Sequence, residues 1–291
     1  MNATVPRVAS STAELSAAAR KRMLGIRGEP LLYADWLRVV FLHFEVDAEA
    51  LQRAVPFELD LREGRAYLSL VAFTMRGMHP RLGGKLGALL LKPIATNNFL
   101  NVRAYVKHRG EPGIHFLAEW MDNPLSVHLG PVVFDLPYRL GRLEYCHRHE
   151  VGELRGSVSE ISSGGRILLP LLGERARVRA GVSLKSANFV YDAKMDAQAN
   201  FAPCAADSLD EFLLERYTAF TVRNSALRIP RSALFHIWHP PWPQTPVRVS
   251  LLDTSLLTET WPWFADARLV GANYSPGIRG VWMGRPQATE N

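Results

Sequence analysis

Short apolar runs, rich in β-branched and aromatic residues, recur along the chain from residue 33 onward and are separated by Gly, Pro, Asn or Asp. Runs of this length and composition are typical of β-strands. They cover residues 37–44, 66–73, 99–107, 114–120, 132–134, 142–149, 153–161 and 189–191. Strands at this spacing, with few helices between them, favour a sheet that closes on itself. We therefore predict a mainly β (α+β) fold: an antiparallel, barrel-like closed sheet with a few short helices.

Capping boxes and turn residues mark the few expected helices. A Ser-x-x-Glu box at residues 11–14 predicts a short helix that ends near Gly25, and residues 47–55 predict another. The first helix lies in a poorly anchored lead-in, residues 1–29. Residues 30–287 then form a single β domain, because no internal repeat or low-complexity linker divides them.

A third helix is expected from residue 208 to residue 220, and it carries an unusual cation. Its apolar stripe runs from Leu209 to Phe220, and Arg216 falls inside that stripe. A buried guanidinium without a partner costs several kcal/mol. Arg216 must therefore meet a protein carboxylate, backbone carbonyls or a ligand anion. A structural pair and a substrate-binding role both remain open.

The strand at residues 100–107 alternates between apolar and polar side chains. Leu100 and Val102 lie on one face, whereas Asn101 and Arg103 lie on the other. In an open sheet the polar face is solvated. In a closed sheet it can line the interior, where Asn101 would orient a ligand and Arg103 would hold its carboxylate.

Composition and charge exclude several classes of protein. Hydrophobic residues make up 47% of the chain, and no run approaches the length of a membrane span. The formal net charge of +6 is scattered, so we expect no nucleic-acid partner and no membrane partner. Two cysteines without a CxxC motif, and no signal-peptide pattern, fit a cytoplasmic protein.

Motifs for metals and cofactors are missing from the sequence. His147 and His149 share one strand face, but no HExxH or CxxC accompanies them. The chain has no GxSxG, P-loop or GxGxxG motif. We therefore expect no metal and no cofactor. A small-molecule ligand is the expected partner, and a homo-oligomer remains open.

Several ordered stretches together suggest a known family. They are residues 35–44 with 55–56, 101–106 with 112–116, 136–138, 212–217, 239–243 and 274–277. From about residue 33 to residue 285, their order and spacing resemble the uncharacterised YqjF-like family of bacterial proteins. That family is similar in fold to acetoacetate decarboxylase, a β-rich, barrel-like protein with an internal active site. The resemblance implies such a fold and such a cavity here.

The same resemblance exposes a departure in chemistry. In the decarboxylase, a Phe-Pro-Lys-Lys-Leu segment carries the Schiff-base lysine and a second lysine that lowers its pKa. Tyr138 and Arg139 stand at the matching positions of this chain, in the segment 136–140. Tyrosine cannot form an imine, and arginine is effectively never deprotonated. Phe99 stands where the YqjF-like pattern often has an acid.

These residues lead to a ranked set of functions. The first is a cavity for an anionic or carbonyl compound, in which Tyr138 and Arg139 are catalytic and Asn101, Arg103 and Arg216 bind substrate. If the protein is an enzyme, its chemistry is non-covalent and of the lyase or isomerase type. Tyr138 then donates a hydrogen bond or, if the adjacent cation lowers its pKa, serves as acid or base. The rival is a non-enzymatic binding or scaffold protein that has lost the ancestral chemistry. A weaker alternative uses another lysine, such as Lys185.

Overall fold

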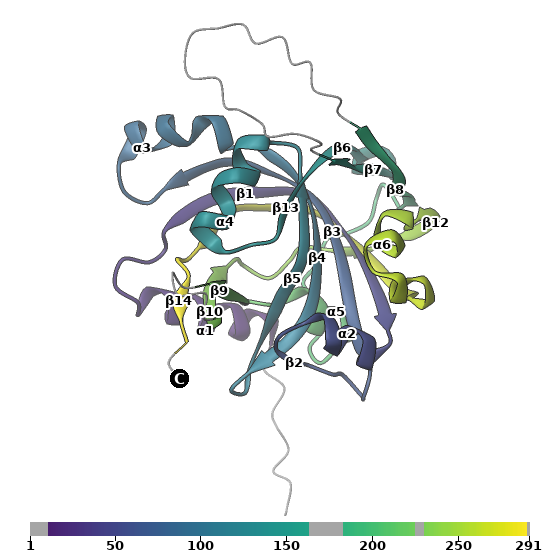
Figure 1. Ribbon diagram of the computed structural model, residues 1–291, viewed down its shortest axis with the longest axis horizontal. Helices are drawn as coiled ribbons and strands as arrows, with labels where there is room; N and C mark the ends of the chain where they lie inside the picture. The colour runs from purple at the N-terminus through teal and green to yellow at the C-terminus, as the bar shows by residue number, and fades with distance from the viewer. Residues whose placement is uncertain (1–10, 163–182, 225–229, 290–291) are drawn as a thin grey trace, which may run out of the picture.

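The strand-forming runs pair edge to edge in the computed structural model, which describes residues 11–162, 183–224 and 230–289. Within those ranges fourteen strands join into one sheet (Figure 1). They are β1 (Leu32–Val46), β2 (Glu58–Leu59), β3 (Ala66–Pro80), β4 (Asn97–His108), β5 (Glu111–Met121), β6 (Tyr138–Arg148), β7 (Glu153–Ser162), β8 (Ser183–Lys194), β9 (Thr218–Asn224), β10 (Pro230–Trp238), β11 (Thr245–Pro246), β12 (Arg248–Asp253), β13 (Arg268–Met283) and β14 (Gln287–Ala288).

Short helices connect and cover these strands. The α-helices are α1 (Thr12–Leu24), α2 (Ala48–Ala54), α3 (Gly84–Leu91), α4 (Pro124–Phe134), α5 (Leu209–Leu214) and α6 (Ser255–Thr260). Single 3₁₀ turns are η1 (Lys92–Ile94), η2 (His149–Val151) and η3 (Pro262–Asp266).

Seven of the described strands form a closed ring. The order is β5–β9–β10–β13–β1–β3–β4, and β4 pairs again with β5. The other four long strands, β6, β7, β8 and β12, extend from β5 as a second sheet on the right of Figure 1. The predicted mainly β, closed fold is confirmed, with one refinement. The sheet is mixed, because β5 pairs in parallel with both β6 and β9.

The ring separates two apolar clusters. All seven ring strands contribute to one cluster, which includes Phe41, Phe73 and Phe235, and only the interior of the ring allows them to converge. The other cluster, which includes Leu100 and Val102, fills the space between the outside of the ring and the second sheet. Burial of these two clusters removes their apolar side chains from water, and this drives folding.

Two of the predicted helices form where the sequence placed them. Ser11 and Glu14 make the reciprocal capping box of α1, and Asp47 caps α2. From residue 11 onward the lead-in is better anchored than we expected. Met23 is fully buried, the Ser16 hydroxyl donates to the carbonyl of His239 at 2.7 Å, and the Trp238 indole donates back to the carbonyl of Ser16.

Two other expectations were wrong in extent or type. The helix that begins after Ser208 ends at Leu214 rather than at residue 220, because residues 218–224 pair with β10 and β5 as strand β9. Residues 132–134 are the end of helix α4, not a strand. Asn123 caps α4 by accepting from the backbone N–H groups of Leu125 and Ser126, and this cap outweighs the strand propensity of the apolar run.

Candidate functional site

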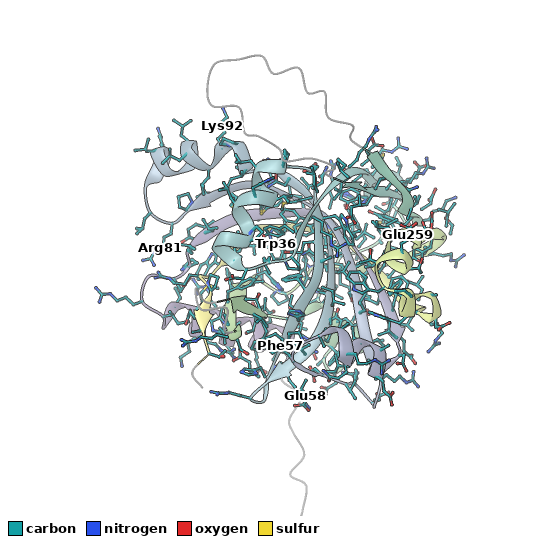
Figure 2. All side chains as sticks on the ribbon, viewed as in Figure 1. Trp36, Phe57, Glu58, Arg81, Lys92 and Glu259 are labelled. Carbon is teal, nitrogen blue, oxygen red and sulfur yellow. The ribbon has the colours of Figure 1, made fainter. Side chains whose placement is uncertain are left out.

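Three adjoining chambers run from the surface into the interior of the ring. The outer chamber, about 190 Å³, lies beneath α4 and the α3–η1 segment. The middle chamber, about 80 Å³, shares Phe99 and Tyr138 with the outer one. The inner chamber, about 20 Å³, shares Asn101 and Trp36 with the middle one. Trp36 lies near the centre of the molecule in Figure 2, whereas Arg81 and Lys92 project from its edge.

The predicted polar face of the strand at 100–107 points into these chambers. Asn101 lines the middle and inner chambers, and Arg103 lines the inner one. Leu100 and Val102 point outward into the cluster between ring and second sheet. The alternation therefore places a polar row inside the closed ring rather than in solvent.

A buried acid, Glu119, completes this polar row. On β5 it lies directly across from Asn101 of β4 and beside Tyr138 of β6, so three neighbouring strands each supply one polar side chain. Glu119 is only 3% exposed, and burial raises the pKa of its carboxyl from 4.5 to about 8. Among the described residues, neither its Oε2 nor the Oδ1 of Asn101 has a hydrogen-bond partner. Two buried polar atoms thus face the chambers without a hydrogen-bond partner in the described ranges, although buried polar groups are normally paired.

Tyr138 faces the same cavity and packs against α4. Its ring covers Gly130, where a Cβ atom would stand 1.8 Å from the ring, so only glycine fits there. Its ring also meets that of Phe99 edge-on at 6.4 Å. Burial, and secondarily the charge of Glu119, raise the pKa of Tyr138 well above its ordinary value. The acid-or-base role open to Tyr138 requires the adjacent cation to lower this pKa, which is instead raised; the role of hydrogen-bond donor needs no such shift.

Arg139 does not lower the pKa of Tyr138, because its side chain points away from the chambers. Successive residues of β6 face opposite sides of the sheet. Arg139 lies 3.4 Å from Glu160 and stacks over the rings of Trp120 and Trp261 at 5.3 and 5.9 Å. The structure does not bring Arg139 together with Tyr138.

Arg216 reaches the inner chamber but is already paired. Its Nη1 donates to the Asp60 carboxylate at 2.7 Å, and its Nε donates to the Phe212 carbonyl at 2.7 Å. The guanidinium also stacks over the Phe212 ring at 4.1 Å. Of the partners that the sequence allowed, it meets a carboxylate and a carbonyl, so its charge is balanced within the protein.

Arg103 is a buried cation that forms no ion pair with any of the described residues. Its Nη2 donates to the Leu213 carbonyl at 2.8 Å, and its guanidinium lies over the rings of Phe41 and Tyr105. Within the described part of the chain its Nε has no partner and no carboxylate lies within ion-pair distance. The nearby acid Glu215 is occupied by the Trp242 N–H and the Tyr217 hydroxyl. Arg103 is therefore buried beside the inner chamber with one hydrogen bond to a carbonyl and no ion pair in the described part of the chain.

The histidines on the neighbouring sheet have structural partners. His147 bonds the Arg38 carbonyl and the Tyr191 hydroxyl, and His149 bonds the Tyr274 hydroxyl. No group of three or more metal-ligating side chains occurs among the described residues. The side chain of Lys185, the alternative imine-forming lysine, lies outside the described residues. No helix in the described part of the chain is long and apolar enough to cross a membrane.

Comparisons with known proteins agree with this architecture. A family model described as DUF2071, uncharacterized conserved protein, matches residues 33–278. The uncharacterized protein YqjF of Bacillus subtilis (strain 168) is 28% identical over 214 residues, which is 73% of this chain and 74% of that protein. The predicted resemblance to the YqjF-like family is confirmed.

Solved structures show the same fold at low sequence identity. Acetoacetate decarboxylase from Legionella pneumophila superposes with a TM-score of 0.56 at 12% identity, covering 89% of this chain and 87% of its own. The enduracididine biosynthesis enzyme MppR, complexed with pyruvate, gives 0.56 at 14% identity, with 90% and 91% covered. An acetoacetate decarboxylase-like enzyme from Sphingomonas wittichii RW1 gives 0.51 at 16% identity, with 90% and 95% covered.

Proposed function

This chain belongs to the DUF2071 family, and from that premise we propose that its ring encloses a binding site for a small carbonyl compound that carries an anionic group. One observation carries the proposal. The Glu119 carboxyl is buried with a pKa of about 8, and its Oε2 and the neighbouring Asn101 Oδ1 have no partner among the described residues. Near neutral pH most of this carboxyl is protonated, so it can donate a hydrogen bond to a ligand carbonyl.

The anionic group is assigned to the inner chamber. Arg103 is buried there without a carboxylate partner in the described part of the chain. His239, which also lines that chamber, is neutral near pH 7, because burial lowers its pKa to about 4. Arg103 therefore supplies the positive charge that a carboxylate in this chamber would meet.

The proposed chemistry is a non-covalent proton transfer. A group with a pKa of about 8 is present in both protonation states near neutrality, which suits a general acid or base. In the smaller fraction of molecules that carry Glu119 as the carboxylate, this group takes a proton from the carbon next to the ligand carbonyl. The C–H electron pair moves to the carbonyl oxygen, and the Tyr138 hydroxyl, held protonated by its raised pKa, donates a hydrogen bond to the enolate. The Glu119 carboxyl then exchanges this proton with solvent, and transfer of a solvent-derived proton from Glu119 back to the carbon regenerates the carbonyl.

Imine chemistry is not part of the proposal. None of the described residues that line the three chambers is a lysine. Tyr138 occupies the wall at which the resemblance would place a Schiff-base lysine, and a phenol cannot form an imine. We therefore assign the site a carbonyl ligand without a covalent intermediate.

Proton exchange on a simple 2-oxo acid tests the chemistry. With 2-oxobutanoate in D₂O, the wild-type protein should accelerate loss of the C3 proton signals in NMR spectra. Glu119→Gln should abolish the acceleration and still bind, whereas Asp122→Asn should leave exchange unchanged. Asp122 is a matched control, because its carboxylate accepts from the Asn98 N–H and does not line the chambers. Equal exchange by wild type and Glu119→Gln rejects the assigned role.

Calorimetry with the same oxo acid tests the anionic end. Arg103→Gln should weaken binding at least about tenfold, and Arg103→Lys should retain more of it, since loss of a charge-assisted hydrogen bond costs roughly 1.5–3 kcal/mol. Arg139→Gln is the matched control, because that guanidinium faces Glu160 instead. Equal binding by Arg103→Gln and wild type rejects the anion subsite.

The rival function is a binding protein without catalysis. It is favoured by Tyr138 and Arg139 standing where the resembling enzyme has its two lysines. The rival predicts that 2-oxobutanoate binds with the same dependence on Arg103 but that its C3 protons do not exchange faster than in buffer.

A further inference from the structure

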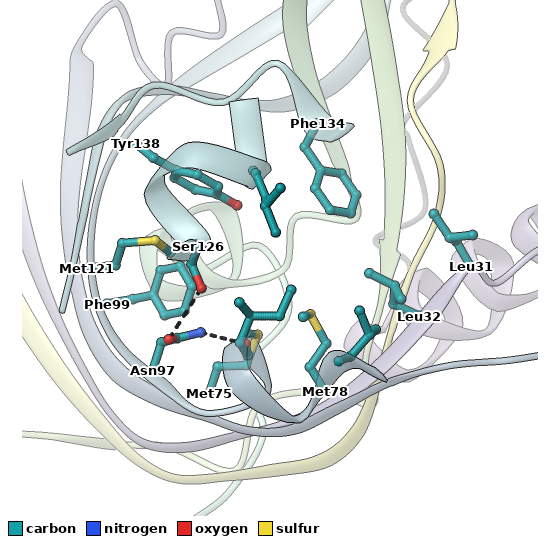
Figure 3. Close-up of a pocket in the computed structure, with 14 residues that line it drawn as sticks. Leu31, Leu32, Met75, Met78, Asn97, Phe99, Met121, Ser126, Phe134 and Tyr138 are labelled. Atoms are coloured by element: carbon teal, nitrogen blue, oxygen red, sulfur yellow. Dashed lines mark hydrogen bonds between the residues drawn. The ribbon is translucent and has the colours of Figure 1, made fainter. Parts of the chain in front are cut away.

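The outer chamber differs in chemistry from the polar row behind it. It is the largest of the three chambers, at about 190 Å³, and its walls are almost entirely apolar. Apart from Tyr138, two polar side chains line the chamber, Asn97 and Ser126. They hydrogen-bond to each other and to the backbone (Figure 3). The Ser126 hydroxyl donates to Asn97 Oδ1 at 3.5 Å, and Asn97 Nδ2 donates to the Ile94 carbonyl at 2.8 Å. An occupant of this chamber therefore gains little from hydrogen bonds and much from apolar contact.

The chamber is continuous with the carbonyl site. Met75, Phe99 and Tyr138 line both the outer and the middle chamber. A ligand whose carbonyl lies at Glu119 and whose anionic group lies toward Arg103 therefore directs its remaining atoms past Tyr138 into the outer chamber.

The shape of the side chains points to a flexible chain rather than a flat ring. Methionine and leucine dominate the wall, and methionine adapts to irregular, mobile apolar groups. Helix α3, which supplies Leu91 to this wall, also carries Leu86, Leu89 and Leu90, each more than 60% exposed. The rim beside the chamber is therefore apolar as well, so a chain that extends past the chamber still meets apolar surface.

We propose that the outer chamber binds an unbranched aliphatic chain, so that the ligand of this protein is an oxo acid with a medium-length alkyl tail. The identity of the whole ligand rests on the function proposed above. The aliphatic subsite itself rests on the outer chamber alone.

Chain-length dependence tests the inference. Calorimetry with 2-oxobutanoate, 2-oxohexanoate and 2-oxooctanoate should give an affinity that rises about threefold to fourfold per added methylene, until the chain fills the chamber. Leu91→Asp should remove this gain, because a carboxylate in an apolar wall resists desolvation. Leu90→Asp is the matched control: it is the adjacent residue of the same helix, 72% exposed, and does not line the chamber.

A second probe separates this inference from the proposed function. 1-Hexanol has the alkyl chain without the oxo acid, so its binding, followed by ligand-observed NMR, reports on the outer chamber only. We expect it to bind wild type and Glu119→Gln alike and to be weakened by Leu91→Asp but not by Leu90→Asp. Hexanol binding of this kind supports the aliphatic subsite, and failure of every oxo acid would then reject the proposed function alone. Absence of hexanol binding, a flat chain-length series, or equal effects of the two aspartates overturns the inference.

Discussion

Replacement of Glu119 by glutamine should change how the stability of the protein depends on pH. Burial raises the folded-state pKa of this carboxyl from 4.5 to about 8, so the native state holds the proton more tightly than the unfolded chain does. For a raised pKa, the stability contribution is fully present below the unfolded value and is lost as pH rises through the folded one. Each pH unit between the two values costs about 1.4 kcal/mol of unfolding free energy, so the whole interval is worth on the order of 5 kcal/mol.

Glutamine has nearly the same shape as the protonated acid and does not titrate. The difference in unfolding free energy between Glu119→Gln and wild type should therefore be constant below about pH 4.5. As pH rises further, the unfolding free energy of the variant should increase relative to that of wild type, and the difference should become constant above about pH 8. Urea unfolding followed by circular dichroism, at half-unit steps from pH 4 to pH 9, measures this difference. Glu49→Gln serves as the control for the loss of one carboxyl group, because the Glu49 side chain is 87% exposed to solvent.

Parallel stability curves for wild type and Glu119→Gln would refute the reasoning, because the carboxyl would then have the same pKa in both states. A difference that grew in the opposite direction would mean that the native state stabilises the carboxylate. Either result would also remove the basis for Glu119 as a proton donor at neutral pH.

Three further outcomes follow from single contacts. Gly130→Ala places a Cβ atom 1.8 Å from the Tyr138 ring, so the ring must move, and calorimetry should show at least about tenfold weaker binding of 2-oxobutanoate; unchanged affinity would contradict the packing. Asp60→Asn leaves the Arg216 guanidinium buried without its counter-ion and should lower the unfolding free energy by about 3 kcal/mol in urea titrations, whereas a loss below about 0.5 kcal/mol would show that the pair is not structural. Burial raises the pKa of the Cys204 thiol to about 12, so Ellman's reagent should label only the chain's other, exposed cysteine until urea unfolds the protein; equal labelling rates would contradict this.

Local patterns determined much of this protein in advance. The spacing of β-forming runs predicted a mainly β, closed sheet, and the Ser11 and Asp47 caps predicted two helices, because propensity and capping act within a few residues. The period of two along residues 100–107 grouped Asn101 with Arg103. The pattern did not show which face of this strand points into the ring, because the alternation is the same in an open and in a closed sheet.

The extent of the third helix was decided by tertiary pairing. The apolar stripe from Leu209 to Phe220 fits a helix, and the chain does begin one after Ser208. Pairing of residues 218–224 with β5 and β10 overrides it, because the ring needs this strand to close. Arg216 consequently lies after the helix, where it reaches Asp60, 156 residues away in sequence.

The acid of the candidate site shows most clearly what the sequence alone could not give. Simple alternation along β5 would put Ala118 inside with Phe116 and turn Glu119 outward. A β-bulge interrupts the register, so that Val102 pairs with Ala118 and Arg103 with Phe116, and Glu119 turns inward. Residue types and their period determined the closed sheet and the polar row on β4. Bulges and the faces of strands depend on pairing between strands that are distant in sequence. That pairing decided that Glu119 lies beside Asn101 and Tyr138 and that Arg139 points to the opposite side of the sheet.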